Sequence, residues 1–255
     1  MFVGGPIAAW AIGLLRATDG GPDATALVGA SVITGAAMTG IVIIVATAIG
    51  MGAARLGSAR TGLFSVGLVL AWAAWSSGRI DSILRTNADS STMWRLAVEG
   101  LILTVVAGMI AFLVDKVART GKDTDGTRGV PSGLAIALVL GAGAAWATAR
   151  SEMAGQALAA AIVAGIVGTV IGRVVDSRTP TWAYVGVIAV LSVAGPAAAA
   201  VMQGNDLLEV TYAGHLLPIA RLAPLDWIAG AFLGVPLGSS WAASLMERPA
   251  PDASA

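Results

Sequence analysis

The charged residues of this chain fall in short clusters, and the stretches between clusters are about as long as a bilayer is thick. Residues 24–54 carry no charged side chain. Six further apolar runs follow, at 61–78, 96–114, 129–149, 153–172, 179–203 and 227–246. Because a helix of about 20 residues crosses the hydrocarbon core, the pattern predicts an all-α, polytopic transmembrane helix bundle.

The first residues are a candidate for an eighth span. Residues 2–15 are apolar but short, and they include Gly4, Gly5 and Pro6. We expect this segment to cross the membrane, with an interfacial or re-entrant segment as the alternative. Residues 1–247 would then form a single integral membrane domain, and 248–255 a disordered cytoplasmic tail.

Composition excludes several functional classes. Charged residues make up 12% of the chain, against about a quarter in a soluble domain, and the mean hydropathy is +0.82. The net charge is zero, so the lipid bilayer, and no nucleic acid, is the expected partner. With no cysteine and a single histidine, His215, we expect no metal and no cofactor.

The basic residues predict the orientation. Nine Lys and Arg fall on one side of the predicted spans and six on the other, which accounts for all 15. The nine are Arg55, Arg60, Lys116, Arg119, Lys122, Arg128, Arg173, Arg178 and Arg248. The positive-inside rule makes this side cytoplasmic. We therefore expect a multi-pass protein of the cytoplasmic (inner) membrane with a cytoplasmic C-terminus.

A repeated motif suggests tandem helical hairpins. AAWSSGRID at 73–81 and AAWATARSE at 144–152 align without gaps, and each ends a predicted span. We interpret the chain as four hairpins, at 2–54, 61–118, 130–177 and 180–247. The alternative is a chance match within an alanine-rich sequence, in which the arginines only signal topology.

Tryptophans and glycines indicate how the helices are placed. Indoles prefer the headgroup level, so we interpret as interfacial anchors Trp75, Trp94, Trp146, Trp182, Trp227 and Trp241. Glycines four residues apart let helices approach closely, and they occur at Gly168/Gly172 and Gly230/Gly234/Gly238. We expect packing surfaces there, with a homo-oligomer or membrane-complex interface as a further possibility.

Two spans contain a proline near the middle, at Pro196 and Pro236. Proline leaves a helix carbonyl without its partner, and paired interruptions mark substrate sites in many transporters. We therefore predict a substrate-binding site at Pro196, Pro236, Ser239 and Ser240. The alternative is that the prolines only kink packed helices.

One acidic residue, Glu99, lies inside a predicted span, with Arg95 four residues before it. Ionisable residues at this depth are costly and commonly functional, so Glu99 and Arg95 join the predicted substrate site. The alternative is an ion pair between the two side chains at the helix entry.

Further polar residues gather on the predicted outer side. We expect an outer vestibule formed by Arg79, Asp81, Arg150, Glu152 and Asp226, in addition to Arg95 and Glu99. The alternative is that all of these are solvated loop residues. The segment 79–95 is expected to lie in the interface and cover the vestibule.

Three functions compete at this point. The first is a permease or channel-like carrier for a small neutral or weakly polar solute, which predicts a water-filled cavity reaching Pro196 and Pro236. The second is a non-catalytic anchor subunit of a membrane complex, which predicts a dry, close-packed centre. The third is a lipid-modifying enzyme using Glu99 or Asp81, which predicts a lateral opening beside Glu99. Since no catalytic motif is found, we do not expect an enzyme.

Overall fold

The computed structural model describes residues 3–87, 89–119, 131–151 and 153–247, and this part of the chain contains helices and turns but no strands. Seven segments are long and apolar enough to cross a membrane, which confirms the predicted all-α polytopic bundle. They are α2 (Val32–Leu56), α3 (Ala59–Trp75) with α4 (Ile80–Thr86), α5 (Ser90–Ala118), α6 (Pro131–Thr148), α7 (Ala154–Val175), α8 (Thr181–Ala189) with α9 (Leu191–Gln203), and α11 (Pro224–Met246). The shorter elements are α1 (Gly4–Ile12), α10 (Leu207–Tyr212) and the 3₁₀ turn η1 (Pro218–Ala220).

Polar residues at the span boundaries start the long helices. The Ser31 hydroxyl accepts a hydrogen bond from the Thr34 amide at the start of α2, and Ser58 does the same for Thr61 at the start of α3. Such side-chain caps satisfy the free N–H groups of the first turn. Because only Gly57 and Ser58 separate α2 from α3, the two helices pack as an antiparallel pair.

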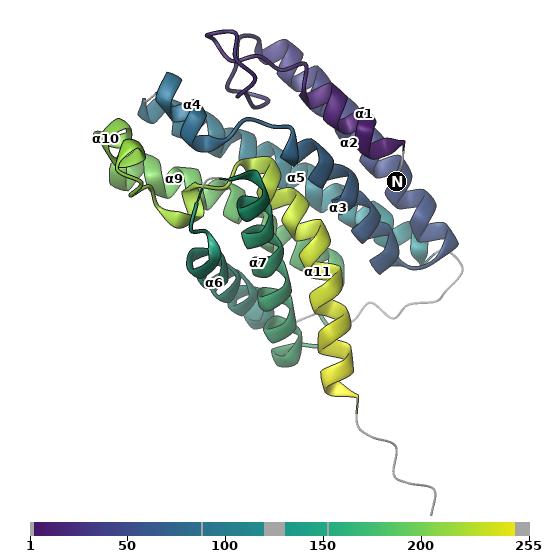
Figure 1. The fold of residues 1–255 in the computed structure, drawn as a ribbon. Helices are drawn as coiled ribbons and strands as arrows, with labels where there is room; N and C mark the ends of the chain where they lie inside the picture. The colour runs from purple at the N-terminus through teal and green to yellow at the C-terminus, as the bar shows by residue number, and fades with distance from the viewer. Residues whose placement is uncertain (1–2, 88, 120–130, 152, 248–255) are drawn as a thin grey trace, which may run out of the picture.

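Helix α11 is the centre of the bundle. It packs against α3, α5, α7, α8 and α9 (Figure 1), and it is the most buried of the seven membrane-length segments. Its glycines allow this approach, because a Cβ on Gly230 would lie 2.3 Å from the Cβ of Ala161 on α7. Gly234 and Gly238 also contact α7.

The second predicted glycine surface is covered in the same way. A Cβ on Gly168 would lie 2.5 Å from the Ala137 carbonyl oxygen of α6, and one on Gly172 would lie 2.7 Å from that of Gly133. Both predicted glycine surfaces therefore pack against helices of the same chain. They hold the bundle together, and an interface with another chain would need a different surface.

The long connections gather at one end of the bundle, here called the cap end. It comprises residues 13–31, 76–87, 89, 149–151 and 204–223 (Figure 1). The Gly78 amide donates to the Ala24 carbonyl at 3.0 Å, and Arg85 of α4 stacks on the Tyr212 ring of α10. The short connections 57–58 and 176–180 form the opposite end.

The predicted eighth span is too short. Helix α1 has nine residues, or about 14 Å at 1.5 Å per residue, which is half of a bilayer core. It packs on α2 and α3, where a Cβ on Gly4 would meet Ile49 and Val69. The alternative of a re-entrant segment is the one that the helix length supports.

The two proline-containing spans behave differently from the prediction. Helix α11 runs through Pro236 without a break. The other span is interrupted at Val190, between α8 and α9, and Pro196 lies inside α9. At the break the Val193 amide donates to Val190, and the Ala189 carbonyl instead accepts a 2.9 Å hydrogen bond from Thr104 of α5. We expected a helix break at each proline. The structure has a single break, at Val190, which precedes Pro196 in the chain.

The tryptophan prediction needs one correction, at Trp227. Trp75, Trp94, Trp146 and Trp241 are all exposed, as interfacial anchors require, and Trp182 is partly buried. Trp227, in contrast, is 0% exposed, because it lies in a cluster with alanines of α6 and α7 and with Ile219 and Leu222 of the segment before α11. It is a core residue.

The four-hairpin repeat stays a prediction. Helices α6 and α7 form a close pair, as the 130–177 unit requires. In the 61–118 unit, however, α3 packs more extensively on α2 and α11 than on α5. The 2–54 unit pairs a nine-residue helix with a 25-residue one.

Candidate binding site beside Glu99

Glu99 is buried in α5, with only 4% of its surface exposed. Its Oε2 accepts a 2.6 Å hydrogen bond from the Thr25 hydroxyl and a 2.9 Å bond from the Leu27 amide. The predicted ion pair with Arg95 is not formed, and Arg95 is exposed. The sequence-based alternative for Glu99 is therefore wrong, since its partners come from a loop more than 70 residues away.

A cavity of about 150 Å³ lies beside the Glu99 carboxylate. Its walls come from α2, α5 and the preceding loop, and comprise Ala26, Leu27, Ala36, Thr39, Gly40, Ile43, Glu99, Ile102 and Leu103. Ala36 and Ile102 are exposed on the flank of the bundle. A Cβ placed on Gly40 would meet nothing within 4 Å. The cavity therefore opens sideways between α2 and α5, toward the lipid.

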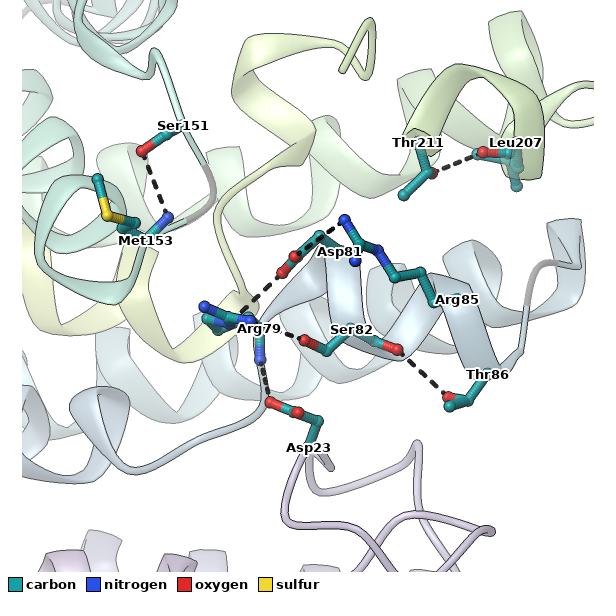
Figure 2. Close-up of polar contacts among 10 residues, drawn as sticks. All are labelled: Asp23, Arg79, Asp81, Ser82, Arg85, Thr86, Ser151, Met153, Leu207 and Thr211. Atoms are coloured by element: carbon teal, nitrogen blue, oxygen red, sulfur yellow. Dashed lines mark hydrogen bonds and ion pairs between the residues drawn. The ribbon is translucent and has the colours of Figure 1, made fainter. Parts of the chain in front are cut away.

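Residues 23–27, here called the roof segment, separate Glu99 from the rest of the cap end. The Asp23 carboxylate accepts a 3.3 Å hydrogen bond from the Arg79 amide (Figure 2). Thr25 is 5% exposed, and its amide donates to the Val28 carbonyl at 2.8 Å. A Cβ on Gly35 of α2 would lie 2.1 Å from the Ala26 carbonyl oxygen. The roof segment thus packs tightly on α2 and reaches Glu99 directly.

Some of the predicted vestibule residues come together. The Arg79 guanidinium lies 3.5 Å from the Asp81 carboxylate and 3.1 Å from the Ser82 hydroxyl, while Arg85 approaches Asp81 at 3.9 Å (Figure 2). Arg79 and Arg85 are about half exposed. Exposed pairs of this kind contribute less than about 1 kcal/mol each to stability. They form a polar surface above the roof segment.

The other vestibule residues have different roles. Asp226 is 6% exposed, and its Oδ2 accepts a 2.9 Å hydrogen bond from the Ala223 amide, so it caps α11. Arg150 is exposed, and its carbonyl accepts a 2.8 Å hydrogen bond from Arg221. Arg221, which the sequence did not single out, also donates to Leu216 and Gly214 and fixes the 214–221 turn. Glu152 lies outside the described residues.

The proline site is not assembled as predicted. Gly195 approaches the Ile219 carbonyl of η1, so Pro196 lies beneath the cap-end turn. Pro236 follows Gly234, which contacts Ile162 and Gly165 of α7. Ser240 donates to the Pro236 carbonyl at 3.1 Å, and the buried Ser239 hydroxyl has no partner among the described residues. None of the cavities described here is lined by either proline.

Two narrow voids continue from the Glu99 cavity into the bundle. The first is lined by Thr25, Thr39, Ser77 and Glu99, and the second reaches Ile110 of α5 and Ile228 of α11. Each holds about 10 Å³, which is the space for about one water molecule. The described centre is therefore close-packed, with Thr39 lining all three spaces.

The arrangement has a clear chemical character. Of the nine residues that line the lateral cavity, only Thr39 and Glu99 have polar side chains. The hydrogen bonds from Thr25 and Leu27 both reach Glu99 Oε2, and the backbone of Ala26 also donates to this carboxylate. The cavity thus combines apolar walls with one acidic acceptor, which suits a ligand with an apolar body and a donor head.

Comparisons with protein-family models, curated proteins and solved structures give no match for this chain. What the fold defines is the class, a multi-pass integral membrane protein of seven membrane-length helical segments. Any finer assignment rests on the residues around Glu99.

Proposed function

We propose that this membrane protein binds a small, membrane-soluble ligand that enters sideways from the lipid and places a hydrogen-bond donor on Glu99. The observation that carries the proposal is the buried Glu99 carboxylate in the wall of a cavity that opens between α2 and α5. The cavity volume of about 150 Å³ accommodates a group the size of a short alkyl chain or a single ring.

The ligand class follows from the charge of the site. A carboxylate inside a membrane is costly unless a proton or a positive group neutralises it. No ion pair joins Glu99 to a described basic side chain. A protonated amine on the ligand would supply the missing charge and a charge-assisted hydrogen bond. We therefore infer an apolar amine as the preferred ligand, with a hydroxyl compound as a weaker one.

A lateral opening beside Glu99 is the feature expected for a lipid-modifying enzyme, but no catalytic motif accompanies it, so we favour a permease. The water-sized voids extend from Glu99 toward the centre of the bundle, lined by α2, α5 and α11. A solute held at Glu99 would cross only after these helices separate, because both voids are narrower than the lateral cavity. The proposal places the ligand at Glu99 instead of the prolines.

Photolabelling tests the proposal. Membranes containing the protein are illuminated with a diazirine-bearing butylamine, and the labelled peptides are identified by mass spectrometry. We expect label on Ala36, Gly40 and Ile102, and about tenfold less in Glu99→Gln, the expected loss for a charge-assisted hydrogen bond. A diazirine-bearing butyrate should not label the site. Equal labelling by both probes would overturn the proposed ligand class.

A matched pair of glycine variants provides the control. Gly40→Phe fills the cavity without meeting an existing atom at Cβ, and should abolish labelling. Gly143→Phe on α6 also projects into open space, but it lies outside the lining of the cavity. Labelling that survives Gly40→Phe would place the ligand elsewhere.

A second function, the anchor subunit of a membrane complex, is favoured by the close-packed centre. Native mass spectrometry of the protein from its own membrane separates the two functions. Stoichiometric partner chains would support the anchor, whereas recovery alone, with a retained small amine, would support the permease.

The orientation is part of the proposal, with the opposite end of the bundle and the C-terminus in the cytoplasm. Because the chain has no cysteine, single cysteines report the side directly. In intact cells an impermeant maleimide should label Asp206→Cys at the cap end but not Ser177→Cys at the opposite end. The reverse result would invert the orientation.

A further inference from the structure

A second polar site lies at the opposite end of the bundle, around Arg173 in the last turns of α7. Its Nη1 donates a long, 3.4 Å hydrogen bond to the Thr181 hydroxyl at the start of α8. Its Nε is buried and has no partner among the described residues. Buried guanidinium N–H groups are nearly always satisfied, so we expect an acceptor here that the described residues do not supply.

A second arginine adds to the positive charge there. Arg60 is the second residue of α3, at the same end of the bundle, and its positive charge acts against that of Arg173. Neither arginine forms an ion pair within the described part of the chain. The two like charges come from different helices, and among the described residues no ion pair joins either of them to a carboxylate, which is unfavourable unless an anion binds.

The nearby acid, Asp176, is engaged elsewhere. It attracts Arg173 electrostatically, but its carboxylate accepts a 3.1 Å hydrogen bond from the Arg178 amide and a short one from the Thr179 hydroxyl. These bonds fix the turn between α7 and α8. The first turn of α8 has no side-chain cap, so its free N–H groups add to the donors around Arg173.

We propose that Arg60 and Arg173 bind the phosphate of an anionic phospholipid headgroup between α3, α7 and α8. Both arginines lie at the ends of membrane-length helices. Helix ends at this position are at the level of the lipid headgroups. A phosphate diester offers the planar guanidinium groups the acceptor oxygens that they bind best. The site is independent of Glu99, which belongs to the cap half of α5.

Native mass spectrometry with defined lipids tests the site. The purified protein is mixed with phosphatidylglycerol or with phosphatidylcholine of the same chain length, and the retained adducts are counted. We expect at least tenfold stronger retention of phosphatidylglycerol, reduced to the phosphatidylcholine level in Arg60→Gln. Arg55→Gln, an exposed arginine of the last turn of α2, should retain the lipid as the unchanged protein does.

A second variant and a second phosphate source complete the test. Because Arg173 is half-buried, Arg173→Gln could also destabilise the fold. Its lipid retention is therefore interpreted only if its thermal unfolding matches that of the unchanged protein. If it does not match, Arg60→Gln alone decides the outcome. Inorganic phosphate at millimolar concentration should not displace the lipid. Displacement by inorganic phosphate would assign the site to a free anion. Equal retention in Arg60→Gln and Arg55→Gln would overturn the proposal.

Discussion

The hydroxyl of Thr25 donates a 2.6 Å hydrogen bond to the carboxylate of Glu99, and both side chains are buried. This bond joins the loop that follows α1 to the third turn of α5. It closes the cap-end side of the lateral cavity and leaves the flank between α2 and α5 open. For the proposed ligand, the bond would therefore leave the flank between α2 and α5 as the route to Glu99.

Removing this hydroxyl should loosen the roof segment. Thr25→Val removes the hydroxyl donor and leaves the Glu99 carboxylate with the backbone donors of Ala26 and Leu27, so we expect the free energy of unfolding to fall by about 1 kcal/mol. Thermal unfolding in detergent measures the change. Thr47→Val is the control, because its hydroxyl bonds only to the Ile43 carbonyl of its own helix. Equal losses in the two variants would show that the Thr25 bond has no special weight.

Two glycines of α2 should respond in opposite ways to alanine. At Gly35 a new Cβ would lie 2.1 Å from the Ala26 carbonyl oxygen, so Gly35→Ala must displace the roof segment. We expect a loss of about 1–3 kcal/mol. At Gly40 the new Cβ meets nothing, and the better helix propensity of alanine should add up to about 1 kcal/mol. Denaturation of both variants measures the difference, and a loss at Gly40 would contradict the open cavity.

The helix break at Val190 depends on Thr104. Because the Thr104 hydroxyl donates to the Ala189 carbonyl and also lies 3.1 Å from the Ser192 hydroxyl, Thr104→Val should cost about 1 kcal/mol. Thr104→Ser keeps the donor and should be close to neutral. Thermal unfolding distinguishes them, and a Ser variant as unstable as the Val variant would assign the effect to packing.

Asp89 gives the bundle a dependence on acid pH. Hydrogen bonds from the hydroxyl and amide of Ser91 hold the pKa of this N-cap carboxyl below its usual range. Since the folded-state pKa is lowered, the stabilisation is present above the unfolded-state pKa of about 4 and is lost as pH falls through the folded value. The stability difference between the unchanged protein and Asp89→Asn should therefore close on acidification. A difference that does not change with pH would contradict this role.

The sequence predicted the spans because their signal is local. A charge-free run of bilayer length can be recognised without knowing what packs against it. The same is true of Glu99, which stands out as an acidic residue inside a predicted span. The partner of Glu99 could not be predicted in this way. Thr25 is an ordinary loop residue, and its distance along the chain from Glu99 hides the contact.

The misassigned residues share a physical reason. Trp227 and Asp226 look interfacial by their position at the start of a span, but both are buried, Trp227 among residues of α6, α7 and the turn before α11. Pro236 suggested a break, yet α11 tolerates it because helices pack on every side and hold its course. Burial by a distant segment is a tertiary property that one-dimensional patterns do not carry.

The central place of α11 has a consequence for biogenesis. A ribosome makes α3, α5, α7, α8 and α9 before it makes Pro224, so their inward faces meet lipid while the chain is still growing. The surface of α7 that later packs against Gly230, Gly234 and Gly238 stays uncovered throughout that time. The bundle can therefore assemble around its centre only after residue 246 has entered the membrane. Nascent chains halted before that point would be the substrates of a membrane quality-control protease.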